Sequence, residues 1–395
     1  MQVAQILIIT SRNVVTTGGE FSLIFNRANT LKQHWGITSD IVALKNVAFG
    51  VKSGEEAFGS GVYIETSFKN PASLLGGYEK VIKEAENKLA TKKYDAVLVS
   101  GVGLLRYVDR IRKSARDALL CADVHGYYGD GKLLAKDESP FLGAFHRLAS
   151  SVEEWEQKTF LKQFDRIFTV SSEYVTFLCQ NAGCYKQQFY VVPCAINEGI
   201  EPLSSAERDY DRKSYRSEYG IEDTDLLFVY SGGVSSWQCL PQTIDLVNRM
   251  NELRPAKLLI LSGDQEGARR VVDGCESVAT VLIDGYPPSQ LPKVFCAADF
   301  CVMLRDDVPT NHFAYPNKFL EYVSANRPVI ATPYVFDVAK QIKQFGVGVI
   351  YDNDVIALNR SIAAFDCDNA RYQDLLASTS FKQTLKPFVT DLELA

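Results

Sequence analysis

Short runs of apolar and β-branched residues, separated by longer amphipathic stretches, recur along the whole chain and constrain its fold more than any other feature. Six runs lie in the first half, at 5–10, 40–44, 95–100, 119–124, 166–170 and 189–192. Six more lie in the second half, at 226–231, 257–262, 280–283, 300–304, 328–331 and 347–351. Apolar runs of this length suit strands buried on both faces, as in a parallel sheet covered by helices. The alternation of such strands with helices predicts an α/β fold made of βαβ units in doubly wound sheets.

The length of the chain favours two domains. Its 395 residues exceed the span of a common domain, which is about 100–200 residues. The stretch 197–219 is polar and lacks a clean periodicity, so we interpret it as a linker and the entry to the second domain. This interpretation places an N-terminal domain at 1–196 and a C-terminal domain at 197–378. The final segment, 379–395, is predicted to be helical in part.

Composition excludes several classes of protein. Hydrophobic residues make up 46% and charged residues 23% of the chain, as in an ordinary soluble globular protein. The net charge of -6 argues against a general nucleic-acid binder. The nine cysteines form no CxxC pair and are interpreted as small buried residues in a reducing compartment. The N-terminus lacks a basic region and its apolar stretch is short, so a cytoplasmic location is expected.

Two pairs of glycines follow predicted strands. Gly18 and Gly19 come after the first strand of the first half, and Gly232 and Gly233 after the first strand of the second half. Paired glycines let the backbone approach a ligand and point amides at an anion, although a turn that merely needs glycine has the same sequence. The first pair forms no GxGxxG fingerprint and no P-loop, so it does not suggest NAD or ATP. The stretch after the second pair carries Gln238 but no cation.

The segment 315–332 carries the most informative group of polar residues. Asn317, Lys318 and Glu321 lie at the start of a predicted helix that leads into a buried strand. A helix N-terminus suits a diphosphate, Lys318 adds a point charge, and Glu321 can accept hydrogen bonds from two sugar hydroxyls. Arg305, which ends the preceding strand, is a further candidate for the phosphate charge. Its alternative role is an ion pair with one of the two aspartates that follow it.

One histidine stands at the end of a predicted strand. The sequence Asp123-Val124-His125-Gly126 closes the fourth apolar run, and ligands gather at the carboxyl ends of strands in open α/β sheets. A lone histidine is more often structural than catalytic. His125 is nevertheless a candidate site residue, because it lies at a strand end and is followed by a glycine.

The segment 315–332, together with the residues around Gly18, His125 and Gly232, resembles GT-B glycosyltransferases, in particular bacterial family 4-like enzymes that build capsule or other surface polysaccharides. The resemblance implies two Rossmann-like domains that face each other across a cleft, with the segment 379–395 crossing back to the first domain. It also implies a nucleotide-sugar donor, with a UDP-sugar as the default.

The same resemblance suggests a role for each candidate residue. Glu321 is expected on the ribose, while Lys318 and Arg305 are expected near the phosphates. The two glycine pairs, Gln238 and Asn317 complete the donor site, and His125 is expected to hydrogen-bond the transferred sugar. No metal or cofactor is implied, because such enzymes typically use helix dipoles and basic side chains.

The chain departs from the family pattern at two places. Family 4 enzymes usually carry two glutamates separated by seven residues, but Phe313 occupies the position of the first. The usual arginine and lysine after the second glycine pair are also missing. Retention of stereochemistry is preferred on the resemblance, and two alternatives stay open: a non-hydrolysing nucleotide-sugar epimerase, and a noncatalytic subunit that stabilises an active glycosyltransferase.

A basic stretch at 106–116 suggests a second contact surface. Arg106, Arg110 and Lys113 fall on one face if the stretch is helical. Such a face is either simply solvated or attracted to anionic lipid and a lipid-linked acceptor. The second interpretation would bring the protein to the inner face of the cell membrane, where a glycan or lipid-linked glycan is the expected acceptor.

Overall fold

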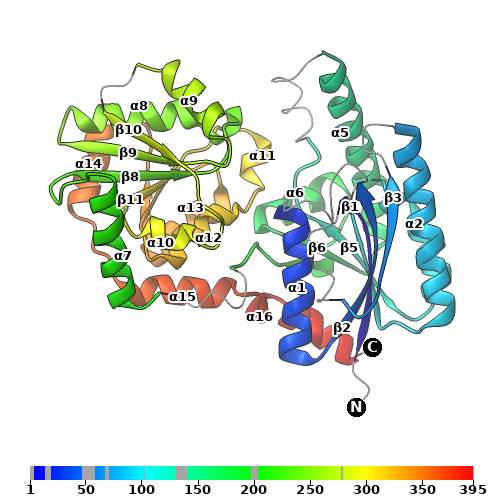
Figure 1. Ribbon diagram of the computed structural model, residues 1–395. Coiled ribbons are helices and arrows are strands. Elements are labelled where there is room, and N and C mark those ends of the chain that lie inside the picture. Colours follow the sequence, from blue (N-terminus) through cyan, green and yellow to red (C-terminus); the bar gives the residue numbers. More distant parts are fainter. Residues whose placement is uncertain are drawn as a thin grey trace. The chain divides into compact units, whose positions relative to one another are not determined.

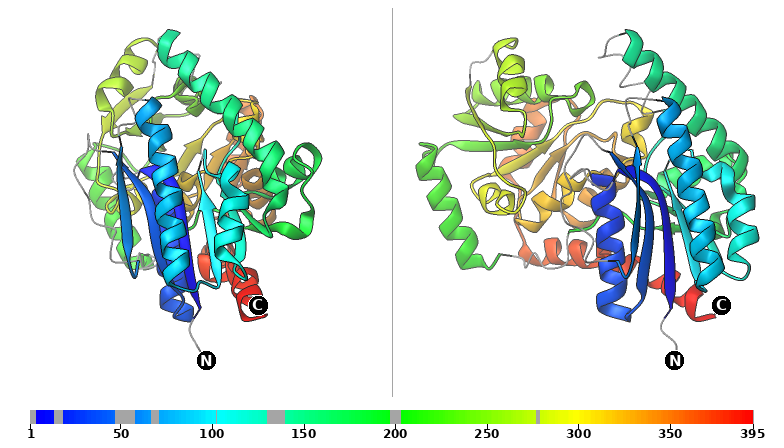
Figure 2. Two further views of the ribbon diagram at one scale, coloured as in Figure 1. Left: turned by 90° about the vertical axis from the view of Figure 1, so that its right-hand side faces the viewer. Right: turned by 45° about the vertical axis from the view of Figure 1, so that its right-hand side comes forward.

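The computed structural model describes residues 4–13, 19–46, 58–66, 71–101, 103–129, 140–196, 203–276 and 279–394. Contacts divide the chain into two compact units (Figures 1 and 2). The first unit takes Met1–Pro193 together with Thr379–Ala395, and the second takes Cys194–Ser378.

The first unit is built on a seven-stranded parallel sheet with the order β3-β2-β1-β4-β5-β6-β7. Its strands are β1 (Gln5–Asn13), β2 (Thr38–Asn46), β3 (Gly61–Thr66), β4 (Ala96–Ser100), β5 (Leu119–Val124), β6 (Arg166–Thr169) and β7 (Phe189–Val191). The six strands predicted for this half are all present. The sequence analysis missed β3, because this edge strand is largely half-exposed and carries no continuous apolar run.

Helices cover both faces of this sheet. They are α1 (Gly19–Trp35), α2 (Pro71–Thr91), α3 (Val108–Ala115), α5 (Pro140–Phe160), α6 (Ser172–Asn181), α16 (Phe381–Thr384) and α17 (Lys386–Leu394). Helix α1 lies on one side of the sheet and α2 on the other (Figures 1 and 2).

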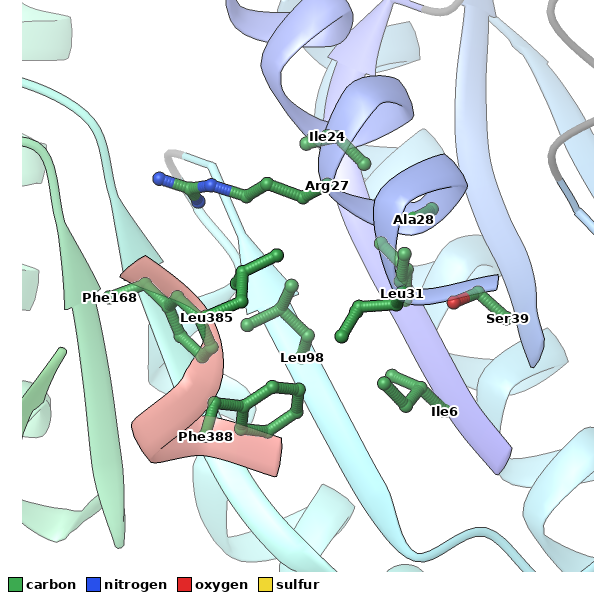
Figure 3. A pocket seen from close by; sticks show the side chains of 11 residues that line it. Ile6, Ile24, Arg27, Ala28, Leu31, Ser39, Leu98, Phe168, Leu385 and Phe388 are labelled. Carbon is green, nitrogen blue, oxygen red and sulfur yellow. The ribbon is translucent and has the colours of Figure 1, made fainter. Parts of the chain in front are cut away.

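The last two helices pack into the core of the first unit. Leu385 and Phe388 face Leu98 of β4 and Leu31 of α1 across a cavity of about 20 Å³ (Figure 3). The Phe388 ring also meets the Phe168 ring edge-on, with centroids 5.0 Å apart. The cavity has room for about one water molecule, so it is no ligand site.

The second unit has a six-stranded parallel sheet with the order β10-β9-β8-β11-β12-β13. Its strands are β8 (Leu226–Ser231), β9 (Ala256–Leu261), β10 (Thr280–Asp284), β11 (Phe300–Met303), β12 (Val329–Ala331) and β13 (Gly348–Ile350). Its helices are α7 (Ser205–Glu218), α8 (Leu240–Asn251), α9 (Gln265–Asp273), α10 (Leu291–Phe295), α11 (Pro309–His312), α12 (Asn317–Ser324), α13 (Phe336–Phe345), α14 (Val355–Ala363) and α15 (Asn369–Thr379). All six strands predicted here are present.

The stretch 197–219 is interpreted from the sequence as a linker and the entry to the second domain. The linker part of this interpretation is wrong for Ser205–Glu218, because these residues form helix α7 of the second unit. A capping box starts the helix: the Ser204 hydroxyl accepts from the Glu207 amide, and the Glu207 carboxylate accepts from the Ser204 amide at 2.8 Å. Arg212 and Arg216 then bind Asp299 at 2.6 and 3.2 Å. The helix docks mainly through charged groups, which is why its sequence shows no apolar periodicity.

The strand order reverses once in each sheet, and these two places are where ligands bind in doubly wound folds. The reversal lies between β1 and β4 in the first unit and between β8 and β11 in the second. Beyond the carboxyl ends of β8 and β11 come Gly232 and Arg305, respectively. His125 follows β5, one strand away from the reversal in the first unit. None of the described helices is both long and apolar enough to cross a membrane.

Candidate ligand-binding sites

In the second unit, the turn after β8 leaves room for one side chain from α12. Gly232 has a φ of +142°, and a Cβ at this position would overlap the Nζ and Cε atoms of Lys318. It would also collide with Oε1 of Gln238. A residue with a side chain would therefore be strained here and would displace the lysine.

Lys318 reaches across this turn from the first turn of α12. Its ammonium group donates a hydrogen bond to Oε1 of Gln238 and lies 4.9 Å from the centre of the Tyr230 ring. The Tyr230 hydroxyl donates to the carbonyl of Gly233 at 2.5 Å. Helix α12 is tied to β8 by Tyr322, whose hydroxyl accepts from the Ser231 amide at 2.9 Å. The structure thus brings Gly232, Gly233, Gln238 and Lys318 together.

Arg305 supplies a second positive charge beside the lysine. The residue is 6% exposed, and its guanidinium donates to the carbonyl of Leu304 at 2.8 Å. Across the described ranges, no carboxylate forms an ion pair with it. Asp306 accepts from the Cys239 thiol at 3.2 Å and Asp307 binds His312 at 2.7 Å. The charge of Asp306 still acts on Arg305 and opposes the fall in its pKa that burial causes.

The electrostatics of this cluster favour an anion. Burial lowers the pKa of Lys318 well below its usual range, and the positive charge of Arg305 lowers it further. Burial also lowers the pKa of Arg305. Burial raises the pKa of Glu321, although the charge of Lys318 acts in the opposite direction. A negative ligand group would offset the repulsion between the two cations and favour the charged form of the lysine.

The start of α12 adds to the same region. Asn317 is the first residue of the helix and is exposed. The residue before it, Pro316, offers no side-chain cap, so the first amides of the helix have no side-chain acceptor from that position. Lys318 and Glu321 are one turn apart and both remain partly exposed, so a ligand can reach them.

In the first unit, His125 belongs to a buried hydrogen-bonded chain. Its Nε2 atom lies 2.6 Å from Oδ2 of Asp123, whose other oxygen accepts from Arg27 at 2.9 Å. Arg27 also donates to the carbonyl of Val192 at 2.7 Å. Burial would raise the pKa of Asp123, but the charges and hydrogen bonds of His125 and Arg27 outweigh it and hold the pKa at about 2. The Nδ1 atom of His125 is buried and finds no partner among the described residues.

The basic residues at 106–116 have different surroundings. Arg106 lies in a short 3₁₀ turn and binds the buried carboxylate of Glu156 at 2.5 Å. Arg110 lies on α3 and binds two glutamates of α2 at 2.6 and 2.7 Å. Lys113 is exposed near the end of α3. Internal carboxylates therefore offset the charge of both arginines, and Lys113 is the candidate of the three that faces solvent.

Only one residue of the first glycine pair lies in the described part of the chain. Gly18 lies outside the described residues, and Gly19 is the first residue of α1. Sequence reasoning missed Arg27 and Tyr230 and gave Asp123 no role of its own. The signal for Asp123 was present, because a carboxylate two residues before a strand-end histidine lies on the same side of the strand. No group of three or more His, Cys, Asp or Glu side chains that could hold a metal occurs in the described part of the chain.

No protein-family model matches this chain, and no curated protein matches it in sequence. Its fold is similar to that of a glycosyltransferase from Rickettsia africae, with a TM-score of 0.70, 13% identity, and 100% of this chain and 99% of that chain covered. It is also similar to Anabaena HepE in complex with UDP-glucose, with a TM-score of 0.65, 13% identity and coverage of 98% and 99%. The lipopolysaccharide outer core galactosyltransferase WaaB matches with a TM-score of 0.65, 14% identity and coverage of 99% of both chains. These similarities confirm the predicted α/β fold of two Rossmann-like domains, which is the GT-B architecture.

Proposed function

We propose that the protein is a glycosyltransferase that takes its sugar from a nucleotide-diphosphate sugar. The observation that carries this proposal is the pair of cations at the strand reversal of the second unit. Within the described residues, neither Arg305 nor Lys318 forms an ion pair with a carboxylate, although burial disfavours the charge of both. A buried arginine and a half-buried lysine beside a glycine turn are suited to a diphosphate, which would supply negative charge to both.

The surrounding groups fit the rest of a donor. Glu321 lies one helical turn from Lys318 and can accept hydrogen bonds from the two ribose hydroxyls. The departing diphosphate gains charge as the sugar bond breaks, so fixed cations aimed at it would lower the barrier. The complex of Anabaena HepE with UDP-glucose, a protein of similar fold, supports a UDP-sugar as the first donor to test.

Finer features of the proposal rest on the family resemblance. Transfer is proposed to be metal-independent and retaining, to act on a glycan or lipid-linked glycan acceptor, and to serve surface polysaccharide synthesis. His125 is proposed to contact the sugar. Membrane contact, if it is electrostatic, would rest more on Lys113 than on Arg106 or Arg110, since the arginines are already paired.

Calorimetric titration of the purified chain tests the donor site directly. UDP, GDP, dTDP and CMP are compared first, and then the sugar nucleotides of whichever base binds. We expect one base to bind, and we expect Lys318→Met and Arg305→Met each to weaken it by at least tenfold, because each loses a charged contact of about 1.5–3 kcal/mol. Lys343→Met and Arg360→Met are matched controls, since both residues are exposed on helices of the same unit. Failure of every nucleotide to bind would refute the proposal.

A noncatalytic subunit that stabilises an active glycosyltransferase is the second candidate, and Phe313 in the position of a family glutamate favours it. Binding alone does not separate the two functions. Release of free nucleotide from the sugar nucleotide, followed with and without glycan acceptors, does so. A bound donor that is never consumed would favour the subunit, while turnover that is lost in Lys318→Met would establish the enzyme.

A further inference from the structure

Arg27 on α1, Asp123 on β5 and His125 form a buried series of hydrogen bonds, which determines whether the Nδ1 atom of His125 donates or accepts a hydrogen bond. We propose that Asp123, held in place by Arg27, is a positioning residue that fixes the tautomer of His125, so that Nδ1 is a hydrogen-bond acceptor for a sugar hydroxyl. The proposal rests on the proposed function only in taking the ligand to be a sugar.

The geometry determines which ring nitrogen carries the hydrogen. Asp123 is fully ionised at neutral pH and can only accept hydrogen bonds. Its Oδ2 atom lies 2.6 Å from Nε2 of His125, so Nε2 must donate. In a neutral imidazole the other nitrogen is then an acceptor. The tautomer of His125 is therefore set by a group that does not itself face a ligand.

Arg27 fixes the orientation of the carboxylate. One guanidinium nitrogen binds Oδ1 of Asp123 at 2.9 Å and the other binds the carbonyl of Val192 at 2.7 Å. The side chains of Arg27 and Asp123 are 4% and 0% exposed, so water does not compete for these bonds. With Oδ1 committed to the arginine, Oδ2 is the oxygen that faces His125.

The last atom of this hydrogen-bonded series, Nδ1 of His125, is suited to bind a ligand. The side chain of His125 is 6% exposed, yet its Nδ1 atom has no partner among the described residues. The hydroxyl of Ser100, the register partner of Asp123 on the next strand, is likewise buried and unpartnered within the same ranges. Buried polar atoms are normally satisfied, so two such atoms at the carboxyl ends of neighbouring strands suit a ligand rich in hydroxyl groups.

The substitution Asp123→Asn reverses the hydrogen bond without removing it. Arg27 still requires an acceptor, so the amide oxygen stays on the arginine and the amide NH₂ group turns to Nε2 of His125. Nε2 must then accept, and the hydrogen moves to Nδ1. Asp165→Asn is the matched control, because Asp165 also binds an arginine in the first unit, Arg112 at 3.0 Å, whereas Nε2 of His125 is bonded to Asp123.

Nitrogen-15 NMR of histidine-labelled full-length protein reads the tautomer directly. The chain has four histidines, so the signals of His125 are identified by their loss in His125→Gln. Spectra are recorded at a pH where the ring is neutral. We expect the hydrogen on Nε2 in the wild type and in Asp165→Asn, and on Nδ1 in Asp123→Asn. A wild-type ring with its hydrogen on Nδ1, or no change in Asp123→Asn, would overturn the proposal; the wild-type result stands even if the variant does not fold.

Transfer from a UDP-sugar supplies the functional test. Asp123→Asn should lower turnover by about tenfold, because a hydrogen bond to the sugar now has the wrong direction. Unchanged turnover with an inverted tautomer would overturn the role proposed for His125. Failure of the proposed function looks different: in that case none of the four nucleotides binds the protein, while the tautomer is still observed.

Discussion

Replacing Gly232 by alanine should weaken nucleotide binding far more than replacing its neighbour Gly233. Gly232 has a φ of +142°, where a residue with a side chain is strained by about 1–3 kcal/mol. Its new Cβ would also occupy the space of the Lys318 ammonium. At Gly233 the new Cβ would lie 3.1 Å from Nε2 of Gln238, the far end of a flexible side chain that can move aside.

These contacts set the expected magnitudes. Displacement of Lys318 removes a charge-assisted contact to the nucleotide of about 1.5–3 kcal/mol, which corresponds to a loss of affinity of about 10- to 150-fold. The strain should lower the melting temperature by about 2–12 °C, given about 2–4 °C per kcal/mol for a unit of this size. Gly233→Ala should cost less than about threefold in affinity, or about 0.6 kcal/mol.

Calorimetric titration with the nucleotide that binds, combined with thermal unfolding, measures both quantities. A double-mutant cycle then separates strain from displacement. In the background of Lys318→Ala, the substitution Gly232→Ala should cause little further loss of affinity, because the displaced group is already gone. Equal losses from the two glycine variants, or an equal effect of Gly232→Ala with and without Lys318, would refute this reasoning.

Three further predictions follow from individual contacts. Burial and a neighbouring cation lower the pKa of Lys318, so nucleotide binding should take up a proton and weaken as pH rises. Calorimetry in two buffers of different ionisation enthalpy measures the proton uptake. Equal binding heats in the two buffers would contradict the prediction. The pKa of Asp123 is about 2, below its ordinary 3.8, so about 2 kcal/mol of stability present above about pH 4 should disappear as pH falls towards 2. A difference in unfolding free energy between wild type and Asp123→Asn that stayed constant over this window would contradict that assignment. Phe388→Ala should destabilise the first unit by about 3–5 kcal/mol in urea unfolding, because the ring packs against Phe168, whereas Leu253→Ala, at an exposed position, should cost less than about 1 kcal/mol.

The elements that were predictable from sequence are those whose own residues reveal their environment. A central strand such as β8 is buried along its whole length, so its apolar run is visible without any knowledge of its neighbours. Strand β3 and helix α7 were missed because their surroundings are mixed. The first is an edge strand, and the second is held largely by arginines bound to Asp299.

The candidate sites were predictable only as separate residues. Gln238 and Lys318 are 80 positions apart and Arg27 and Asp123 are 96 positions apart, yet each pair is hydrogen-bonded. No local pattern shows that Arg27 turns inwards, because a charged residue on an amphipathic helix normally faces solvent. Strand ends could be named from the sequence, while the partner of each side chain depends on the sheet order.

The residues around Lys318 also show why a binding site of this kind does not follow from rules of protein stability alone. A lysine beside a buried arginine, with no ion-paired carboxylate in the described chain, destabilises the free protein, since burial and like charge both oppose its ionisation. Rules that select stable sequences would replace it with an apolar residue. A ligand that supplies negative charge would recover, on binding, the free energy that the two neighbouring cations cost the protein. The same reasoning applies to His125, whose Nδ1 atom has no partner among the described residues and costs stability until a hydroxyl group satisfies it. In both units, the residues that fit the fold least well are therefore the ones that best indicate what it binds.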